Sequence, residues 1–402
     1  MRCAVKRYSL CIGHRSTLIA VTMPSLYLLN PCTTNLMTQT PDSISNIDWH
    51  QLTAQIKQWA YELGFAQVGI TDVNMEQHAK ALKDWLAKGY HGEMSYMADH
   101  GNKRYTPDAL VPGTLRIISV RMNYMPEDVQ TLEILDHPSK AYISRYALGR
   151  DYHKLIRKRL TQLGKRIESL FSQLSNDVAY RAFVDSAPVL ERGIAQKAGL
   201  GWIGKNAMLI NPKAGSYFFL GELFTNLPLI MDEPYDDMNC GSCTACFAAC
   251  PTDAIVDNHV VDARKCISYL TIELKSSIPT ELRSKIGNRI FGCDDCQLCC
   301  PWTKFTDNTQ ETDFTPRHQL DDVELLELFH WDESTFLQKT EGMPLRRSGF
   351  ELWQRNIAVA LGNAAQSEHI IQALEEKRAN STEMVQEHID WAIEQQIAKR
   401  KQ

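Results

Sequence analysis

The sequence predicts an α+β fold in which three regions of different character follow one another. Helical and strand patterns mix without strict alternation up to about residue 232, which is typical of an α+β or layered α/β domain. Cysteines gather between residues 233 and 305, and helical periodicity prevails over residues 306–402. A chain of 402 residues is long enough for about two or three domains.

The first 36 residues differ in composition from the rest of the chain. Early basic residues and the apolar stretch Leu18–Val21 would suit a signal peptide, but no clear small-residue cleavage site follows. We interpret residues 1–36 as a disordered leader, or as the product of an upstream start codon with Met37 as the true start. The first folded domain is expected to span residues 37–232.

Hydrophobic periodicity predicts the elements of this first domain. Apolar residues recur at helical spacing from Trp49 to Leu63, and Gly64 stands where a C-terminal cap is expected. A longer amphipathic helix is predicted over residues 153–174. The other apolar runs predict strands at 67–71 and 115–120, a strand that ends at Val184–Asp185, a helix from about Pro188, and extended segments at 208–211 and 217–224.

The segment Gly199–Gly204 matches the dinucleotide-binding pattern G-x-G-x-x-G. That pattern indicates a nucleotide site when it follows a strand and opens a helix. Here it follows a helix-like segment and leads into a strand. We therefore expect a tight loop in which the glycines allow close approach of the backbone.

Two cysteine runs that each end in Cys-Pro define the chemistry of the second region. The first matches the ferredoxin spacing C-x2-C-x2-C-x3-C-P with Cys240, Cys243, Cys246 and Cys250. The second holds Cys293, Cys296 and Cys300, and Cys266 lies between the runs. Zinc sites use two separate C-x2-C pairs, and structural disulfides are unusual in large cytosolic proteins, so the spacing favours iron–sulfur clusters.

The number of thiols fits two [4Fe–4S] clusters, each held by four cysteines. By the ferredoxin crossover rule, one cluster is expected to take Cys240, Cys243, Cys246 and Cys300. The other is expected to take Cys250, Cys266, Cys293 and Cys296. Cys299 is an alternative to Cys300, which we favour because it precedes Pro301. The ferredoxin-like domain is placed at residues 233–305.

Asp185 has two interpretations from the residues alone. A carboxyl at a strand end that faces a cleft can act as a general acid if burial raises its pKa. Asp185 and Ser186 before Pro188 also suit the start of a helix, where Asp185 would be an N-cap. The residues do not decide between these two roles.

The net charge of −5 argues against a chain coated in basic charge for bulk nucleic-acid binding, but it leaves room for a local basic patch. The interleaved Tyr146 and Tyr152 would suit phosphate contact combined with base stacking. No run of about 18 apolar residues occurs, so no membrane span is predicted. The candidate patches are the basic residues from Arg145 to Arg159, the cluster Arg346, Arg347 and Arg355, and the run Lys399–Lys401.

Several motifs taken together resemble one family, the epoxyqueuosine reductases. The resemblance runs from about residue 47 to the C-terminus, and the first 36 residues lie outside it. The motifs agree with the family in order and spacing, and they are Arg145–His153, Val184–Arg192, Lys197–Trp202, both cysteine runs and Gly287–Cys293.

This resemblance implies a cobalamin-dependent iron–sulfur oxidoreductase that reduces epoxyqueuosine to queuosine in the anticodon loop of tRNA, the last step of queuosine biosynthesis. Electrons from an unidentified donor would pass through the two [4Fe–4S] clusters to cobalamin. The implied fold has an N-terminal α/β cobalamin-binding domain, the ferredoxin-like domain, and a HEAT-like α-helical domain at residues 306–402. A cytoplasmic monomer is expected.

The resemblance also assigns roles to individual residues. Asp185 matches the family's proposed proton donor. Some relatives carry a cysteine where this chain has Ser144, and many have an apolar residue where it has Cys299. Cobalamin contacts are implied at Arg104, Ser144, Asp185, Lys205, Asn206, Ser268 and Asp295.

Two other classes of protein remain as alternatives. A corrinoid iron–sulfur reductive dehalogenase would share the cofactors, but it usually carries a twin-arginine signal, and the leader of this chain has no Arg-Arg pair. A simple electron-transfer module would leave about 200 residues before the clusters unexplained. A corrinoid retained on purification would argue against the second alternative.

Overall fold

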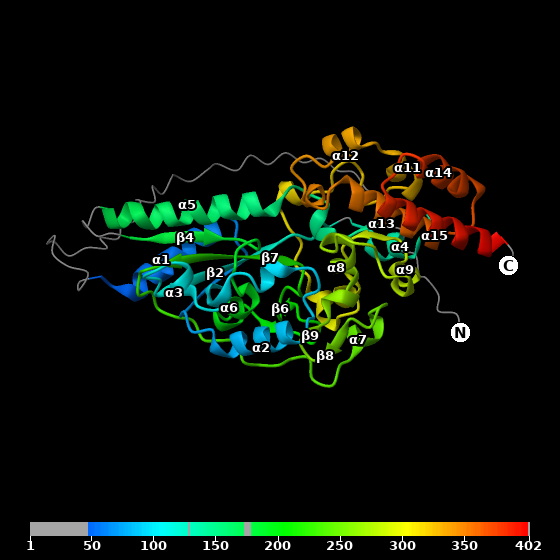
Figure 1. Ribbon diagram of the computed structural model, residues 1–402. Helices are drawn as coiled ribbons and strands as arrows, with labels where there is room; N and C mark the ends of the chain where they lie inside the picture. The colour runs from blue at the N-terminus through cyan, green and yellow to red at the C-terminus, as the bar shows by residue number, and fades with distance from the viewer. Residues whose placement is uncertain (1–46, 128, 173–177, 401–402) are drawn as a thin grey trace, which may run out of the picture. The chain divides into compact units, whose positions relative to one another are not determined.

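The computed structural model describes residues 47–127, 129–172 and 178–400, which form a mixed fold of helices and strands (Figure 1). The predicted leader at residues 1–36 lies outside the described residues. Within the described part of the chain, no helix is both long enough and apolar enough to cross a membrane.

The strands are β1 (Gln67–Thr71), β2 (Arg116–Asn123), β3 (Tyr142–Ile143), β4 (Tyr180–Phe183), β5 (Trp202–Ile203), β6 (Leu209–Ile210), β7 (Phe218–Thr225), β8 (Ile255–Asp257), β9 (Val260–Val261) and β10 (Arg289–Phe291). The helices of the first region are α1 (Trp49–Glu62), α2 (Glu76–Ala87), α3 (Pro107–Leu110), α4 (Thr131–Asp136), α5 (Tyr152–Ser172) and α6 (Glu191–Lys197). The later helices are α7 (Ala245–Ala249), α8 (Ile267–Ile272), α9 (Thr280–Ile286), α10 (Asp295–Leu298), α11 (Leu325–His330), α12 (Glu333–Lys339), α13 (Phe350–Asn363), α14 (Glu368–Arg378) and α15 (Glu383–Arg400).

A four-stranded antiparallel sheet with the order β1-β2-β7-β4 organises the first region. Every residue of β2 after Arg116 is buried, because helices cover both faces of the sheet. The strand predicted at 115–120 is observed at Arg116–Asn123, so it extends beyond the apolar run on which the prediction was based. Arg121 and Asn123 belong to it as buried residues that bond to each other.

The helices α1 and α5 pack on one face of this sheet and α6 on the other (Figure 1). Ile56 of α1, Ile156 of α5 and Leu223 of β7 meet in one fully buried core. On the opposite face, Ile194 of α6 packs with Ile117 of β2. Burying one such side chain contributes roughly 1.5–3 kcal/mol, so these apolar stripes fix how α1 and α5 lie on the sheet.

The cysteine-rich segment is tied to the first region by a parallel pair of strands, β3 and β10. The Ser144 N–H donates to the Phe291 carbonyl oxygen at 2.8 Å. Helices α7 and α10, which carry Cys246 and Cys296, contact each other. The two cysteine runs are therefore brought together.

The helices α11 to α15 gather at the C-terminal end of Figure 1, in orange and red. They share one buried core with the cysteine-rich segment and with β3, because Ile143, Leu270 and Trp353 belong to the same cluster. The regions on the two sides of the predicted boundary between residues 305 and 306 therefore share one core. Whether these helices form a HEAT-like domain stays a prediction.

Two local predictions have clear outcomes. A Cβ atom on Gly201 would lie 2.2 Å from the Ile210 carbonyl oxygen, so the expected close approach of the backbone is confirmed. The helix expected from Pro188 begins at Glu191, with Leu190 as its N-cap. The interpretation of Asp185 as a helix N-cap is therefore wrong.

Candidate functional site

Four cysteines from the two runs line one cavity of about 360 Å³. Cys299 is not among the described residues that line it, and its thiol instead donates to the Cys296 carbonyl oxygen at 3.7 Å. The geometry therefore favours Cys300 over Cys299 for this set. Only Cys243 of the set is exposed. The four lining residues are those expected to hold the first cluster, Cys240, Cys243, Cys246 and Cys300.

The cysteines expected to hold the second cluster lie deeper. Burial raises the pKa of Cys296, and the nearby Cys266 and Cys250 thiols add to this effect, so these three lie within electrostatic reach of one another. The Cys293 thiol donates to Asp295 Oδ2 at 2.7 Å. None of the nine described cysteines forms a disulfide. In the described ranges, no three His, Cys, Asp or Glu side chains are grouped so as to hold a single metal ion.

Two of the predicted cobalamin contacts lie at the wall of the cysteine cavity. Lys205 Nζ donates to the carbonyl oxygens of Gly241 and Cys243 at 2.7 and 3.0 Å. Asn206 Nδ2 donates to the Cys296 carbonyl oxygen at 3.0 Å. These two neighbours in sequence therefore connect both cysteine runs to the first region.

Two further predicted contacts lie beside the second run, and a third lies on α8. Ser144 Oγ donates to Asp294 Oδ1 at 2.5 Å, and Asp295 accepts from Arg289 Nε at 2.7 Å. Ser268 is half-buried on α8. Ser144 and Asp295 therefore already have protein partners.

Asp185 lies just after β4 with its carboxyl turned towards the start of α5. Tyr152 Oη donates to Asp185 Oδ2 at 2.6 Å, and His153 Nε2 lies 2.9 Å from the same oxygen. The Asp185 side chain is 55% exposed. One carboxyl oxygen is thus held by two neighbours from α5, while the side chain keeps access to solvent.

The His153 ring lies between two carboxylates. Its Nδ1 is 2.6 Å from Asp151 Oδ1, and its Nε2 faces Asp185. Burial lowers the pKa of His153, but the hydrogen bonds to Asp151 and Asp185 outweigh burial and raise it. This favours an imidazolium that donates to both carboxylates. Arg347 Nη1 lies 3.0 Å from the same Nε2, and its positive charge acts in the opposite direction by lowering the pKa of His153.

The pKa of Asp185 differs from the expectation for a general acid. Partial burial is the largest single influence on the pKa of Asp185 and acts to raise it. The hydrogen bonds from His153 and Tyr152 and the charges of His153 and Arg347 together outweigh burial and lower the pKa. Burial was expected to raise the pKa of Asp185 and so make it a general acid, but the pKa of Asp185 is lowered. Asp185 needs a neighbour that supplies its proton, and His153 is in hydrogen-bond contact.

Two glutamates lie behind Asp185. Glu191 accepts a hydrogen bond from the Asp185 backbone N–H. Burial, and then the charge of Asp185, raise the pKa of Glu191 to about 7. Glu222 of β7 is 0% exposed, and burial and Glu191 raise its pKa well above the usual value. Three carboxyls therefore share one corner of the sheet.

Arg104, another predicted cobalamin contact, lies on the same side as these carboxyls. It is buried, its Nη2 donates to the Tyr96 carbonyl oxygen at 2.8 Å, and the charge of Glu191 acts on it. Its Nε has no hydrogen-bond partner among the described residues. Asp185 in turn affects the pKa of Tyr96, which burial first of all raises to about 12.

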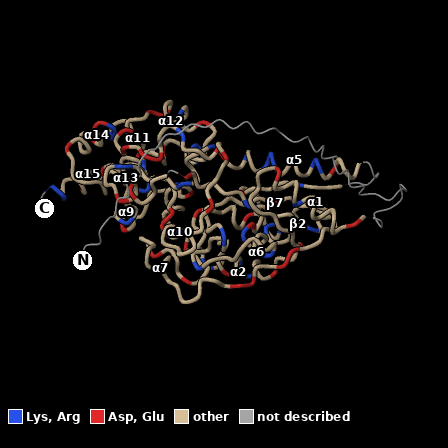
Figure 2. Tube along the Cα trace, turned by 180° about the vertical axis from the view of Figure 1, so that it is seen from behind, with Lys and Arg blue, Asp and Glu red and all other residues tan. Residues whose placement is uncertain are grey.

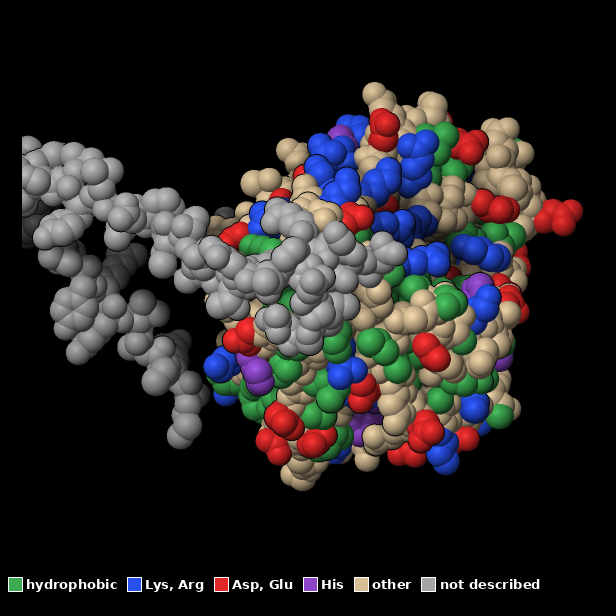
Figure 3. Space-filling model, turned by 90° about the vertical axis from the view of Figure 1, so that its left-hand side faces the viewer, with side chains coloured by type: hydrophobic (Ala, Val, Ile, Leu, Met, Phe, Trp, Pro, Cys, Tyr) green, Lys and Arg blue, Asp and Glu red, His purple; other side chains and the backbone are tan. Residues whose placement is uncertain are grey.

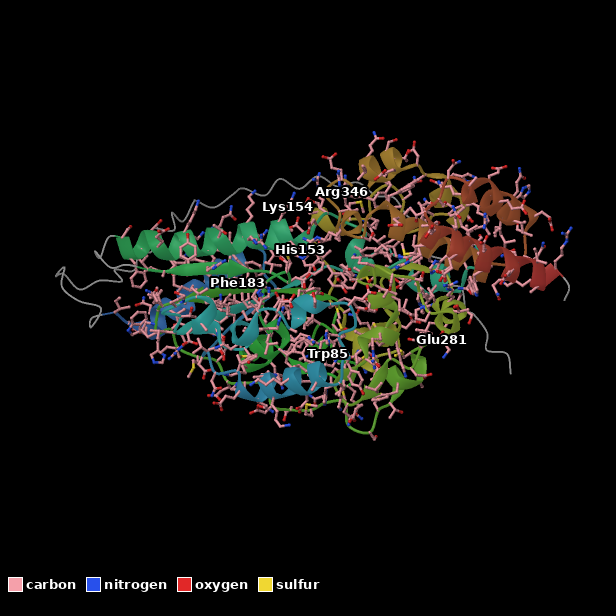
Figure 4. The ribbon with its side chains drawn as sticks, viewed as in Figure 1. Trp85, His153, Lys154, Phe183, Glu281 and Arg346 are labelled. Carbon is pink, nitrogen blue, oxygen red and sulfur yellow. The ribbon has the colours of Figure 1, made fainter. Side chains whose placement is uncertain are left out.

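A basic surface adjoins this site. Figure 2 shows Lys and Arg recurring along α5, and Figure 3 shows basic side chains gathered where α5 lies. In Figure 4, His153 and Lys154 mark the start of α5, with Arg346 nearby. The short 3₁₀ helix Pro344–Arg347 contacts α5 through Arg347 and His153. We call these exposed residues the basic surface, namely Arg150, Lys154, Arg157, Lys158, Arg346 and Arg347.

Other candidates for nucleic-acid contact are buried. Arg145 is 1% exposed, and Arg355 donates to the backbone carbonyl oxygens of Leu270 and Leu274 inside the core. Tyr152 is buried against Phe219, so it is not free to stack on a base. These expectations were wrong because helical periodicity also places charged and aromatic residues on faces that turn inward.

The roles of Tyr152, His153 and Glu222 were not predicted from the sequence. A usable signal existed for His153, since it falls on the same helical stripe as the buried Ile156 and Leu160. Glu222 interrupts the apolar strand Phe218–Thr225. An ionisable residue on a buried face points to a site.

Comparison with known proteins first defines the class. Residues 239–303 match the family described as "4Fe-4S double cluster binding domain", and residues 104–186 match "Epoxyqueuosine reductase QueG, DUF1730". Together with the cysteine cavity, these matches define an iron–sulfur oxidoreductase.

Individual relatives narrow this class. The chain is 57% identical over 352 residues to an epoxyqueuosine reductase of Pseudomonas aeruginosa, covering 88% of this chain and 96% of that protein. A crystal structure of epoxyqueuosine reductase with an epoxyqueuosine-modified tRNA-Tyr stem loop matches with a TM-score of 0.73 and 28% identity, covering 86% of this chain and 99% of that one. A Bacillus subtilis epoxyqueuosine reductase, whose catalytic aspartate loop is swung out of the active site, matches with the same values. The chain belongs to the epoxyqueuosine reductase family.

Proposed function

We propose that this chain reduces epoxyqueuosine to queuosine in the anticodon loop of tRNA. The names of its relatives and the bound tRNA stem loop of a solved relative support this activity. The reductive dehalogenase alternative has no such support at comparable identity. Family membership thus narrows the substrate class to a modified tRNA.

The observation that carries the proposal is the contact between an acid group and the basic surface. Asp185 Oδ2 is 2.9 Å from His153 Nε2, and Arg347 Nη1 is 3.0 Å from that same nitrogen. Basic side chains bind phosphates, and a base in a single-stranded loop can be splayed out of its stack. A loop bound at this surface would present a base to Asp185.

The chemistry of epoxide removal matches these groups. Loss of the epoxide oxygen as water, with a carbon–carbon double bond left behind, needs two electrons and two protons. The clusters, once assembled, supply electrons one at a time. Asp185 donates a proton to the leaving oxygen, and His153 returns a proton to Asp185 through their hydrogen bond.

Cobalamin is the cofactor that we propose for the reductive step. A buried Arg104 Nε–H that lacks a partner among the described residues suits a group rich in hydrogen-bond acceptors. When bound, cobalamin supplies a strongly reducing cobalt centre. The residues that would hold it are Arg104, Ser144, Asp185, Lys205, Asn206, Ser268 and Asp295.

The test is conversion of the substrate by the assembled enzyme. Protein reconstituted without oxygen, cobalamin and a strong reductant are mixed with tRNA that carries epoxyqueuosine, and the digested nucleosides are analysed by mass spectrometry. We expect loss of one oxygen atom from the modified nucleoside, and a sharp decrease with Asp185→Asn. No change with loaded clusters and cobalamin would refute the activity and direct attention to organohalides.

The remaining expectations follow from this proposal. We infer a division into a cobalamin-binding region at 37–232, a ferredoxin-like region at 233–305 and a HEAT-like region at 306–402, and a monomer that acts in the cytoplasm with a separate electron donor. The eight cysteines of the two sets above are the proposed cluster ligands. Size-exclusion chromatography with light scattering tests the monomer.

A further inference from the structure

The backbone at Asp185 has an unfavourable conformation. Its φ is 52°, in the left-handed region that non-glycine residues avoid. The Ser186 N–H donates to the Val184 carbonyl oxygen at 2.6 Å, which closes a three-residue turn around Asp185. With positive φ at its centre such a turn is rare and strained. Contacts elsewhere must therefore hold Asp185 in place.

The contact that reaches this backbone comes from Glu191. Its carboxyl accepts the Asp185 N–H from a position six residues later, at the first turn of α6. A hydrogen bond from an N–H to an ionised carboxylate is about twice as strong as a neutral one. Glu191 thus fixes the backbone of Asp185, whereas Tyr152 and His153 hold its side chain.

Glu222 explains how Glu191 is itself held. Glu222 is fully buried, and neither of its oxygens has a hydrogen-bond partner among the described residues. It lies near enough to Glu191 for the charge of Glu191 to act with burial in raising its pKa. Two carboxyls close together inside a protein do not both ionise readily, so one of them tends to hold a proton. Glu222 is brought there by the register of β4 and β7, which sets Phe183 opposite Glu222.

The chain of groups is therefore Glu222, Glu191 and the Asp185 backbone. We expect Glu222, which is fully buried, to hold the shared proton, while Glu191 accepts from the Asp185 N–H. An apolar residue at position 222 would be cheaper to bury than a carboxyl. Buried ionisable groups of this kind gather at functional sites.

We propose that Glu191, held by Glu222, is a positioning residue that keeps the Asp185 turn in its left-handed conformation, so that the Asp185 carboxyl stays against Tyr152 and His153. This role rests on the proposed function of Asp185 as the proton donor. Glu191 need not touch the substrate.

Hydrogen–deuterium exchange tests this role without turnover. In the cluster-loaded full chain, the peptide that contains Asp185 and Ser186 is followed by mass spectrometry. Glu191→Leu, which removes the acceptor, is expected to speed exchange of these amides at least tenfold. Glu191→Gln, which keeps an acceptor oxygen, is expected to restore most of the protection. Glu133→Leu makes the same change at an exposed glutamate in the first turn of α4 and is expected to alter nothing.

Kinetics complete the test. Glu191→Leu is expected to lower kcat at least tenfold with little change in the KM for tRNA, and to add no further loss to Asp185→Asn. Unchanged exchange in Glu191→Leu would overturn the positioning role, even if activity fell. Should the parent protein fail to convert epoxyqueuosine, the proposed function fails, whereas the exchange result still decides whether Glu191 holds the turn.

Discussion

At the scale of single residues, Tyr152 combines packing with chemistry. Its ring stacks on Phe219 with centroids 3.8 Å apart and planes at 7°. Its hydroxyl donates to Asp185. Replacing Tyr152 by phenylalanine removes the hydroxyl and keeps the ring. This substitution therefore tests the hydrogen bond to Asp185 separately from the packing against Phe219.

Tyr152→Phe is expected to lower kcat about tenfold, because a hydrogen bond to a charged group is worth roughly 1.5–3 kcal/mol. In the parent protein the hydrogen bond from Tyr152 helps to lower the pKa of Asp185. Loss of this donor should therefore raise the pKa of Asp185. The alkaline limb of the kcat profile should therefore move to higher pH. Steady-state kinetics across pH measures both effects.

Tyr146→Phe is the matched control. Tyr146 packs edge-on against Tyr152 with ring centroids 6.2 Å apart, and its hydroxyl makes no hydrogen bond to Asp185 within the described residues. Equal pH shifts in both variants would show that the Tyr152 hydroxyl has no specific effect on Asp185.

At the scale of elements, α5 carries two functions on two faces. The buried stripe of Ile156 and Leu160 packs on the sheet, while Lys154, Arg157 and Lys158 stand exposed at spacings of three and four. Residues so spaced share one face of a helix. The exposed face is therefore a compact group of positive charge.

Replacing Lys154, Arg157 and Lys158 together by alanine is expected to weaken binding of the tRNA anticodon stem loop. Each lost phosphate contact should reduce the slope of log affinity against log salt by about 1. Fluorescence anisotropy at several salt concentrations measures this slope. The same triple change at Lys80, Lys83 and Lys88, on and just after α2, removes equal charge from other exposed positions and should leave the slope unchanged.

The helix α15 contains a buried histidine, His388, whose uncharged form is favoured in the folded protein. His388 is 0% exposed, its Nε2 accepts the Ile278 N–H at 3.0 Å, and burial lowers its pKa from 6.5 to about 4. The unfolded chain therefore binds a proton at a pH where the folded chain does not. Stability due to this group is complete above pH 6.5 and is lost as pH falls towards 4, by about 3 kcal/mol in total.

His388→Gln should remove this pH dependence. Between about pH 7.5 and pH 5.5 the parent protein should lose about 1 kcal/mol more of its free energy of unfolding than the variant does. Urea unfolding followed by circular dichroism measures the difference. Parallel losses in both proteins would exclude His388 as the titrating group.

Elements and sites differ in how far the sequence predicts them. Periodicity located α1, β1 and α5 within a few residues, because each buries one regular apolar stripe. Cysteine spacing indicated which thiols would meet. Asp185, Glu191 and Glu222 come together because of the register of β4 against β7. This register cannot be predicted from any local pattern in the sequence.

At the scale of the whole molecule, the cysteine-rich segment and the C-terminal helices share one core. Trp353→Ala, at a residue 1% exposed beside Trp331 and Phe336, should cost about 3–5 kcal/mol. Because the cluster cysteines border this core, purified protein should also lose iron. Ile56→Ala, in the separate core of the sheet, should cost about 2–5 kcal/mol and keep its iron. Iron content per chain is measured for both purified variants. Equal iron content in Trp353→Ala and Ile56→Ala would show that the shared core does not support cluster binding.

The pairing of β3 with β10 has a consequence for how the chain is made. Tyr142 and Arg289 are partners in that pair, yet the ribosome adds one long before the other. At about 5–20 residues per second, the second strand emerges roughly 7 to 30 s after the first. During this interval the nascent β3 segment has neither its strand partner nor its core, so it is a candidate for chaperone binding. Because the proposed ligands Cys293, Cys296 and Cys300 follow β10 in the chain, both clusters can be completed only after this interval.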